Sequence, residues 1–223
     1  MKAETKPAVF ELKQLIVPPG NRVELKNISW EMFENILTSL GEGYAARLAY
    51  DNGTLEIKMP LPGHEDDKEI ISDLVKALLE QLEIQYRTLG STTFKNQNMA
   101  KGIEPDQCFY IHNEPAIRGK REIDLNTEPP PDLALEIDIT SDSRVRFNSY
   151  EGLGVPELWR YDGQLLQIFL IQEGKYVESN TSQNFPTIPI IEVIPQYVKQ
   201  SQTAGRIATF KTFRAWVREQ LQQ

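Results

Sequence analysis

The stretch from Asp132 to Thr140 alternates large apolar side chains with small, polar or acidic ones. In a β-strand, successive side chains point to opposite faces, so this alternation predicts a strand with one apolar face. The other face carries Asp132, Ala134, Glu136 and Asp138. An apolar strand face must be covered, so the segment requires a sheet packed against a second layer. The residues of the apolar face are Leu133, Leu135, Ile137 and Ile139.

A second candidate strand, Pro105–Ile111, also begins with a Pro-Asp pair and places Asp106 on one face. If the two strands pair, Asp106 lies one strand spacing, about 4.8 Å, from Glu136, and Asp138 lies about 6.7 Å further along its own strand. Carboxylates this close repel one another unless a cation joins them, and Mg²⁺ binds a few carboxylate oxygens while keeping several waters. The same pattern also fits an acidic sheet surface facing solvent, and this alternative stays open.

The remaining periodicity predicts helices on both sides of a sheet. Ser29 is a candidate N-cap for a helix over Ser29–Leu40, and Asn52-Gly53 predicts a hairpin between Tyr44–Tyr50 and Thr54–Met59. Further helices are expected over His64–Glu83, Ser143–Leu153 and Gly205–Gln223. Further strands are expected at Ile84–Lys95, Pro156–Tyr161 and Leu165–Ile171, with a loop over His112–Pro131. The sequence therefore predicts an α/β (α+β) architecture.

The long helix starting at His64 brings a third acid to this region. Glu65 falls at the edge of the apolar stripe that contains Ile71 and Leu78, where it can reach the rim of the sheet. The alternative is that Glu65 interacts only with the positive helix N-terminus. For His64 an interfacial or capping role is expected rather than metal binding, because the other histidine, His112, lies in a loop.

Composition narrows the classes of protein that fit. The 223 residues suit one domain, and the net charge of −8 argues against a protein that coats DNA nonspecifically. A single cysteine, Cys108, excludes an internal disulfide and a cysteine-based zinc cluster. The sequence has no apolar run of membrane-spanning length and no secretory signal, so a cytoplasmic protein is expected.

Several ordered motifs then carry a family resemblance. They are Gly53-Thr-Leu-Glu-Ile-Lys-Met-Pro-Leu-Pro-Gly-His-Glu65, Gly90-Ser-Thr-Thr, Gly102-Ile-Glu-Pro-Asp106, Pro131-Asp-Leu-Ala-Leu-Glu136 and Tyr150-Glu-Gly-Leu-Gly-Val-Pro-Glu-Leu-Trp159. Together they resemble the Uma-two family of endonucleases, which belongs to the restriction-endonuclease-like PD-(D/E)xK superfamily. The resemblance runs from about residue 25 to the C-terminus. It implies an N-terminal extension over 1–24 and one restriction-endonuclease-like domain over 25–223, with a central mixed sheet flanked by helices.

The resemblance also implies a site. Glu65, Asp106 and Glu136 would be its acids, with Asp138 as a further metal ligand. The expected cofactor is Mg²⁺ (or Mn²⁺), which assists hydrolysis of phosphodiester bonds in DNA. A homodimer is expected because nucleases that cut duplex DNA commonly pair two sites. The C-terminal aromatic stripe, which contains Phe210, Phe213 and Trp216, is a candidate interface, although packing on its own sheet is the use expected first.

One position departs from the superfamily pattern. A lysine is expected two residues after the strand glutamate, where this chain has Asp138. Many members instead place a lysine on the following helix, four residues before the Tyr150 position, and here that residue is Arg146. Arginine can hold a phosphate but stays protonated, so Arg146 is a catalytic candidate that cannot act as a base. Lys101 is a further candidate cation.

Three functions therefore remain open. The first is a metal-dependent endonuclease acting on DNA. The second is a catalytically weakened nuclease fold that serves as a nucleic-acid or protein binding module. The third is a structural interaction protein whose acids lie on the surface.

Overall fold

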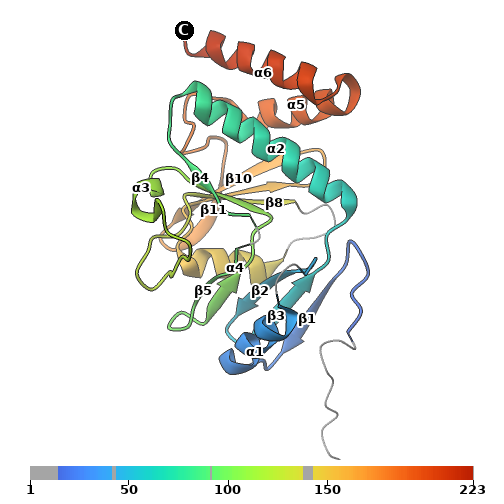
Figure 1. Cartoon of the computed structure of the whole chain (residues 1–223), viewed down its shortest axis with the longest axis vertical. Helices are drawn as coiled ribbons and strands as arrows, with labels where there is room; N and C mark the ends of the chain where they lie inside the picture. The colour runs from blue at the N-terminus through green and yellow to red at the C-terminus, as the bar shows by residue number, and fades with distance from the viewer. Residues whose placement is uncertain (1–14, 42–43, 91, 138–142, 223) are drawn as a thin grey trace, which may run out of the picture.

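The computed structural model describes residues 15–41, 44–90, 92–137 and 143–222, and within these ranges it has eleven strands and six helices (Figure 1). The strands are β1 Arg22–Lys26, β2 Arg47–Asp51, β3 Thr54–Lys58, β4 Arg87–Thr88, β5 Phe94–Asn96, β6 Lys101–Ile103, β7 Gln107–Tyr110, β8 Leu133–Ile137, β9 Glu157–Tyr161, β10 Leu166–Gln172 and β11 Lys175–Ser179. The helices are α1 Trp30–Leu40, α2 Pro62–Gln81, α3 Glu114–Ile117, α4 Arg144–Leu153, α5 Ile190–Ala204 and α6 Arg206–Gln220. The expected α/β (α+β) class is confirmed.

The N-terminal half forms a five-stranded antiparallel sheet in the order β1-β3-β2-β6-β5. The hairpin between β2 and β3 is the one expected from Asn52-Gly53, and both residues have the positive φ that a tight two-residue turn requires. Strand β1 begins at Arg22, within the segment expected to be an N-terminal extension. This sheet was not expected as a separate unit.

The second sheet has six strands in the order β11-β10-β9-β8-β7-β4. Strands β8 and β9 run parallel, whereas the other neighbours are antiparallel, so this is the expected mixed sheet. A parallel pair needs a crossover connection, and α4 provides it. Ser143 caps the N-terminus of α4, and Gly154 ends the helix in the left-handed conformation, so the helix covers the range expected for it.

The two sheets meet where one chain segment passes from the first to the second. Strand β6 belongs to the five-stranded sheet and β7 to the six-stranded sheet, and only Glu104, Pro105 and Asp106 separate them. The backbone N–H of Glu104 still bonds to Leu48 of β2, at 2.9 Å. Asp106 is therefore positioned by both sheets.

The helices cover the mixed sheet on both faces. Figure 1 shows α2, α5 and α6 stacked on one side, with α4 between the two sheets. The apolar faces of α2 and β8 share one core, in which Ile71, Leu74, Leu78, Leu133 and Leu135 are fully buried. Ile139, expected in the same core, lies outside the described residues. None of the helices in the described ranges is long and apolar enough to cross a membrane.

Two expectations about local structure were wrong. The single strand over Ile84–Lys95 is instead two short strands, because β4 pairs with β7 and β5 with β6, and the chain changes sheets between them. The loop over His112–Pro131 contains the short helix α3.

The aromatic stripe of α6 packs inside the molecule at Phe213 and Val217, whereas Leu221 is exposed.

Candidate active site at the junction of the two sheets

Asp106 and Glu136 face each other at the junction. Strands β7 and β8 pair with Gln107 opposite Leu135, so the next pair outward is Asp106 and Glu136. Oδ2 of Asp106 accepts a hydrogen bond of 2.9 Å from the backbone N–H of Ile137. Both carboxylates are buried, on the face expected from the alternation. The sequence-based placement of these two acids on one face is confirmed.

Lys58, at the end of β3, lies between the two acids. Its Nζ is 3.2 Å from Oδ2 of Asp106 and 3.5 Å from Oε2 of Glu136. It also donates a 2.7 Å hydrogen bond to the carbonyl oxygen of Ile137. The lysine side chain is itself nearly buried. Asp106 from the segment between the two sheets, Glu136 of β8 and Lys58 of β3 therefore meet at one buried point.

Helix α4 adds two side chains to Glu136. Nη2 of Arg146 is 2.5 Å from Oε1 of Glu136 and donates a second bond, of 2.6 Å, to the carbonyl oxygen of Glu104. The hydroxyl of Tyr150 also donates to Oε1 of Glu136. Arg146 and Tyr150 are four residues apart on the helix and share a face, as expected. The expected approach of Arg146 to Glu136 is therefore confirmed.

Glu65 is connected to this centre through Arg47. Nη2 of Arg47 is 3.5 Å from Oε1 of Glu65, and its Nε is 3.8 Å from Oδ1 of Asp106. The side chain of Glu65 is 43% exposed and also pairs with Lys68 on the same helix. The structure thus brings Glu65 to the rim of the site rather than beside the two buried acids.

The protonation of the site follows from burial and from its cations. Burial raises the pKa of Asp106, but Lys58, Arg146 and the Ile137 N–H oppose it, and the net pKa is lowered. Burial also raises the pKa of Glu136, and here the net pKa stays raised although Arg146 and Lys58 lower it. Despite burial, Glu136 raises the pKa of Arg146 well above its ordinary value. At neutral pH, Asp106 and Arg146 are charged.

The oxygen donors fit a hard divalent cation. Oδ1 of Asp106 is buried and accepts no hydrogen bond within the described residues, and Glu136 lies beside it. In the described ranges, no three Asp, Glu, His or Cys side chains are grouped to hold a metal ion. Asp138, the fourth expected ligand, lies outside the described residues. Two carboxylates are nevertheless enough for Mg²⁺, which commonly keeps several waters and uses one or two protein carboxylates.

Two site residues were missed by the sequence reasoning. Lys58 and Arg47 lie on the polar faces of β3 and β2, whereas Leu55 and Ile57 of β3 face the apolar core. Alternation in β3 places Glu56 and Lys58 on its polar face, but it does not show that Lys58 approaches Asp106 and Glu136. Lys101, the other candidate cation, instead pairs with Asp51.

Comparisons with known proteins give a family match and a similar solved structure. The family model Uma2, described as "Putative restriction endonuclease", matches residues 30–202. A solved structure from Anabaena variabilis, described as "a putative nuclease belonging to DUF820", is similar at 16% sequence identity and a TM-score of 0.46. The similarity covers 81% of this chain and 96% of that one. No curated protein matches this chain.

The family match covers most of the chain, including the hairpin that carries Lys58, both strand acids and helix α4. The mixed sheet flanked by helices is the architecture expected for a restriction-endonuclease-like fold. This chain belongs to the Uma2 family.

Proposed function

We propose that the protein is a metal-dependent endonuclease that hydrolyses phosphodiester bonds in DNA. The observation that carries the proposal is the position of Lys58, whose ammonium lies within 3.5 Å of both Asp106 and Glu136. An aspartate, a glutamate and a lysine at one buried point form the residue set of metal-assisted phosphodiester hydrolysis. Membership of the Uma2 family supports the same chemistry.

Each residue has a separate role in the proposed reaction. Asp106 and Glu136 would hold Mg²⁺ or Mn²⁺, and Glu65 would add a carboxylate at the rim. When bound, the metal ion supplies a water of lowered pKa and neutralises charge on the phosphate. Lys58, no longer held between the acids, donates hydrogen bonds to the attacking water and to the phosphate oxygens. Arg146 stays paired with Glu136 and fixes the orientation of its carboxylate. It does not act as a base, because arginine stays protonated.

A binding module without hydrolytic activity is the second candidate. The observation that favours it is that both acids already have cationic partners, Lys58 and Arg146. A site neutralised by its own side chains can persist without a metal ion. The two functions differ in one respect that can be measured, which is strand cleavage that depends on a divalent ion.

The first experiment is nicking of supercoiled plasmid DNA with Mg²⁺ or Mn²⁺, comparing wild type, Asp106→Asn and Glu136→Gln. We expect nicking by wild type and a loss of about 100-fold or more in both variants, because each removes a metal ligand. The control is Glu219→Gln, an acid-to-amide change on the exposed surface of α6, which should nick as wild type does. Thermal melting of each variant checks that it is folded.

Wild-type protein that binds DNA but never nicks it with either ion would favour the binding module. Nicking that persists unchanged in Asp106→Asn would place the activity elsewhere or in a contaminant. The homodimer and the cytoplasmic location stay predictions; light scattering of the purified protein tests the former, and a monomer would remove it.

A further inference from the structure

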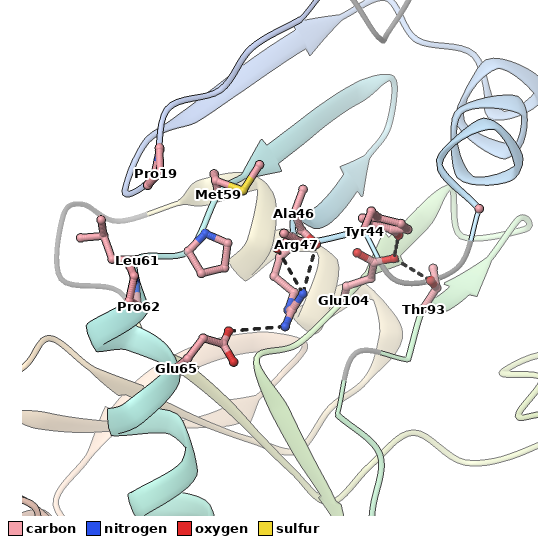
Figure 2. A pocket seen from close by; sticks show the side chains of 13 residues that line it. Pro19, Tyr44, Ala46, Arg47, Met59, Leu61, Pro62, Glu65, Thr93 and Glu104 are labelled. Atoms are coloured by element: carbon pink, nitrogen blue, oxygen red, sulfur yellow. Dashed lines mark hydrogen bonds and ion pairs between the residues drawn. The ribbon is translucent and has the colours of Figure 1, made fainter.

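A pocket of about 690 Å³ is lined by Arg47 and Glu65, and Arg47 also contacts Asp106 of the candidate active site (Figure 2 shows the pocket). One side is apolar: Met59, Leu61 and Pro62 come from the segment around the start of α2, and Pro19 comes from the segment before β1. The opposite side carries the Tyr44 ring. Of the residues that line the pocket, the proposed hydrolysis uses only Glu65. Its size is that of sites that enclose small organic molecules.

Arg47 joins the pocket to the acids. Figure 2 shows its guanidinium directed at Glu65 in the pocket wall, and Nε of the same side chain lies 3.8 Å from Oδ1 of Asp106. The arginine is held in place by hydrogen bonds from Nη1 to the carbonyl oxygens of Ala45 and Ala46. A ligand in the pocket would therefore lie one side chain away from the proposed metal ligands.

The charges of the pocket disfavour a phosphate as its occupant. Two carboxylates, Glu65 and Glu104, line it against one guanidinium, that of Arg47. That guanidinium already has Glu65 and Asp106 as partners. A phosphate dianion or diester would lie among net negative charge. The prolines, the methionine and the tyrosine that line the pocket instead offer apolar and aromatic surface to a neutral planar ring.

Glu104 can supply specificity for such a ring. Its Oε1 accepts hydrogen bonds from the hydroxyls of Tyr44 and Thr93, and its Oε2 accepts one of 2.9 Å from the Leu48 N–H. A carboxylate offers about four acceptor positions, so Oε2 retains capacity for one more donor. Burial and the neighbouring Glu104 raise the pKa of Tyr44, which keeps its phenol neutral. An exocyclic amine of a nucleobase is a donor of the required kind.

We infer that this pocket binds one unpaired nucleobase of the strand whose phosphate lies at Asp106 and Glu136. This inference rests on the proposed function, and it narrows the substrate to single-stranded or locally unpaired nucleic acid. Extracting a base from a duplex costs a few kcal/mol, whereas an already unpaired base enters freely. Stacking of the base on the Tyr44 ring and on the apolar wall then stabilises the complex.

The test measures binding without any divalent ion, with a chelator present, so that cleavage plays no part. Fluorescence anisotropy compares a labelled DNA hairpin that is fully paired with the same hairpin carrying one unpaired nucleotide. We expect the bulged hairpin to bind about tenfold more tightly, a factor within the range of one base-stacking interaction. Equal affinity for the two hairpins would overturn the inference.

Variants that fill the pocket make the assignment specific. Leu61→Trp and Ala45→Trp should each abolish the preference for the bulged hairpin. Leu61→Trp changes a residue next to the start of α2, so Ala45→Trp is included because Ala45 is exposed and a larger side chain is tolerated there. Leu165→Trp, at an exposed position in the β9–β10 turn, is the matched control and should keep the preference. A preference that survives both filling variants would contradict the inference.

Plasmid nicking, measured separately, distinguishes this inference from the proposed function. A bulge preference that the filling variants remove would support the pocket even if no variant ever nicked DNA. The opposite result is that wild type cuts paired and bulged substrates equally and that Leu61→Trp and Ala45→Trp are as active as wild type. That result would overturn the inference about the pocket but not the proposed nuclease function.

Discussion

At the scale of single residues, Glu136 is the point where the cations of the site meet. Lys58 approaches Oε2 from the five-stranded sheet, and Arg146 contacts Oε1 from helix α4. The two differ in chemistry, because an ammonium group can exchange a proton and move on a flexible stem, whereas a buried guanidinium is fixed and always charged. We therefore expect Lys58 to take part in the reaction and Arg146 to support Glu136.

Replacing Arg146 by methionine should destabilise the protein in a pH-dependent way. Removing one partner of a buried ion pair costs about 3–5 kcal/mol, because the other charge stays buried without compensation. The pKa of Glu136 is already raised by burial, and loss of Arg146 raises it further. A carboxyl group whose pKa is raised on folding stabilises the fold below its unfolded pKa, and this contribution is lost as the pH rises through the folded pKa.

The deficit of Arg146→Met in the free energy of unfolding should therefore be larger at about pH 8 than at about pH 5. Urea unfolding with a chelator present measures it. The double variant Arg146→Met/Glu136→Gln is the control, since Glu136 can no longer titrate and the deficit of the double variant should vary less with pH than that of Arg146→Met. A deficit for Arg146→Met that is equal at both pH values would show that the pair is not coupled as described.

Sequence reasoning succeeded at Arg146 and failed at Lys58 for a physical reason. Arg146 was found because the family resemblance places a cation four residues before Tyr150, a spacing that gives the two side chains a shared helix face. Lys58 reaches Asp106 and Glu136 from positions 48 and 78 residues away. Only the packing of the two sheets sets that approach, and no local pattern encodes it.

At the scale of elements, helix α4 depends on its N-cap. Ser143 accepts a 3.1 Å hydrogen bond from the Arg146 N–H and donates from the same hydroxyl to the fully buried Glu56. Ser143→Ala removes both interactions, so we expect a loss of about 2 kcal/mol in the free energy of unfolding. Ser29, which caps α1 and has no buried acid as partner, is the matched control.

For Ser29→Ala we expect a loss of about 1 kcal/mol, the ordinary contribution of a cap. Chemical denaturation of the two variants measures the difference. Equal losses would mean that the bond to Glu56 contributes nothing to stability, and that only the cap matters at Ser143.

The sequence predicted most of the helices and strands, but it did not predict which strands belong to which of the two sheets. The hairpin at Asn52-Gly53, the long helix α2 and the capped helix α4 were expected because turns, caps and apolar stripes are local signals. The strand expected over Ile84–Lys95 was wrong because β4 and β5 join different sheets. Whether a short edge strand forms, and in which sheet, depends on the strand that it pairs with, so the sequence of one segment alone does not predict it.

At the scale of the whole molecule, the candidate site exists because one chain segment crosses from one sheet to the other. Glu104 and Asp106 lie on either side of Pro105 in this crossing, so the pocket carboxylate and the proposed metal ligand are two residues apart. Family membership and the position of Asp106 and Glu136 follow from the sequence, whereas the pocket beside them does not. Its walls come from segments between Pro19 and Glu104 that only the fold brings together.

The most direct test of the proposed centre is the rate of plasmid nicking as a function of Mn²⁺ concentration, in wild type and Lys58→Met. Removing the ammonium frees Asp106 and Glu136 for the metal ion, so the variant should saturate at a lower Mn²⁺ concentration. Its maximal rate should nevertheless fall about 100-fold or more, because one preorganised donor at the reacting phosphate is lost.

Lys101→Met, which removes a lysine paired with Asp51 outside the site, is the matched control and should reproduce the wild-type curve. Thermal melting confirms that both variants are folded. In Lys58→Met alone we expect tighter apparent binding of Mn²⁺ together with a maximal nicking rate reduced about 100-fold or more. A Lys58→Met protein that nicks DNA at the wild-type maximal rate would contradict it.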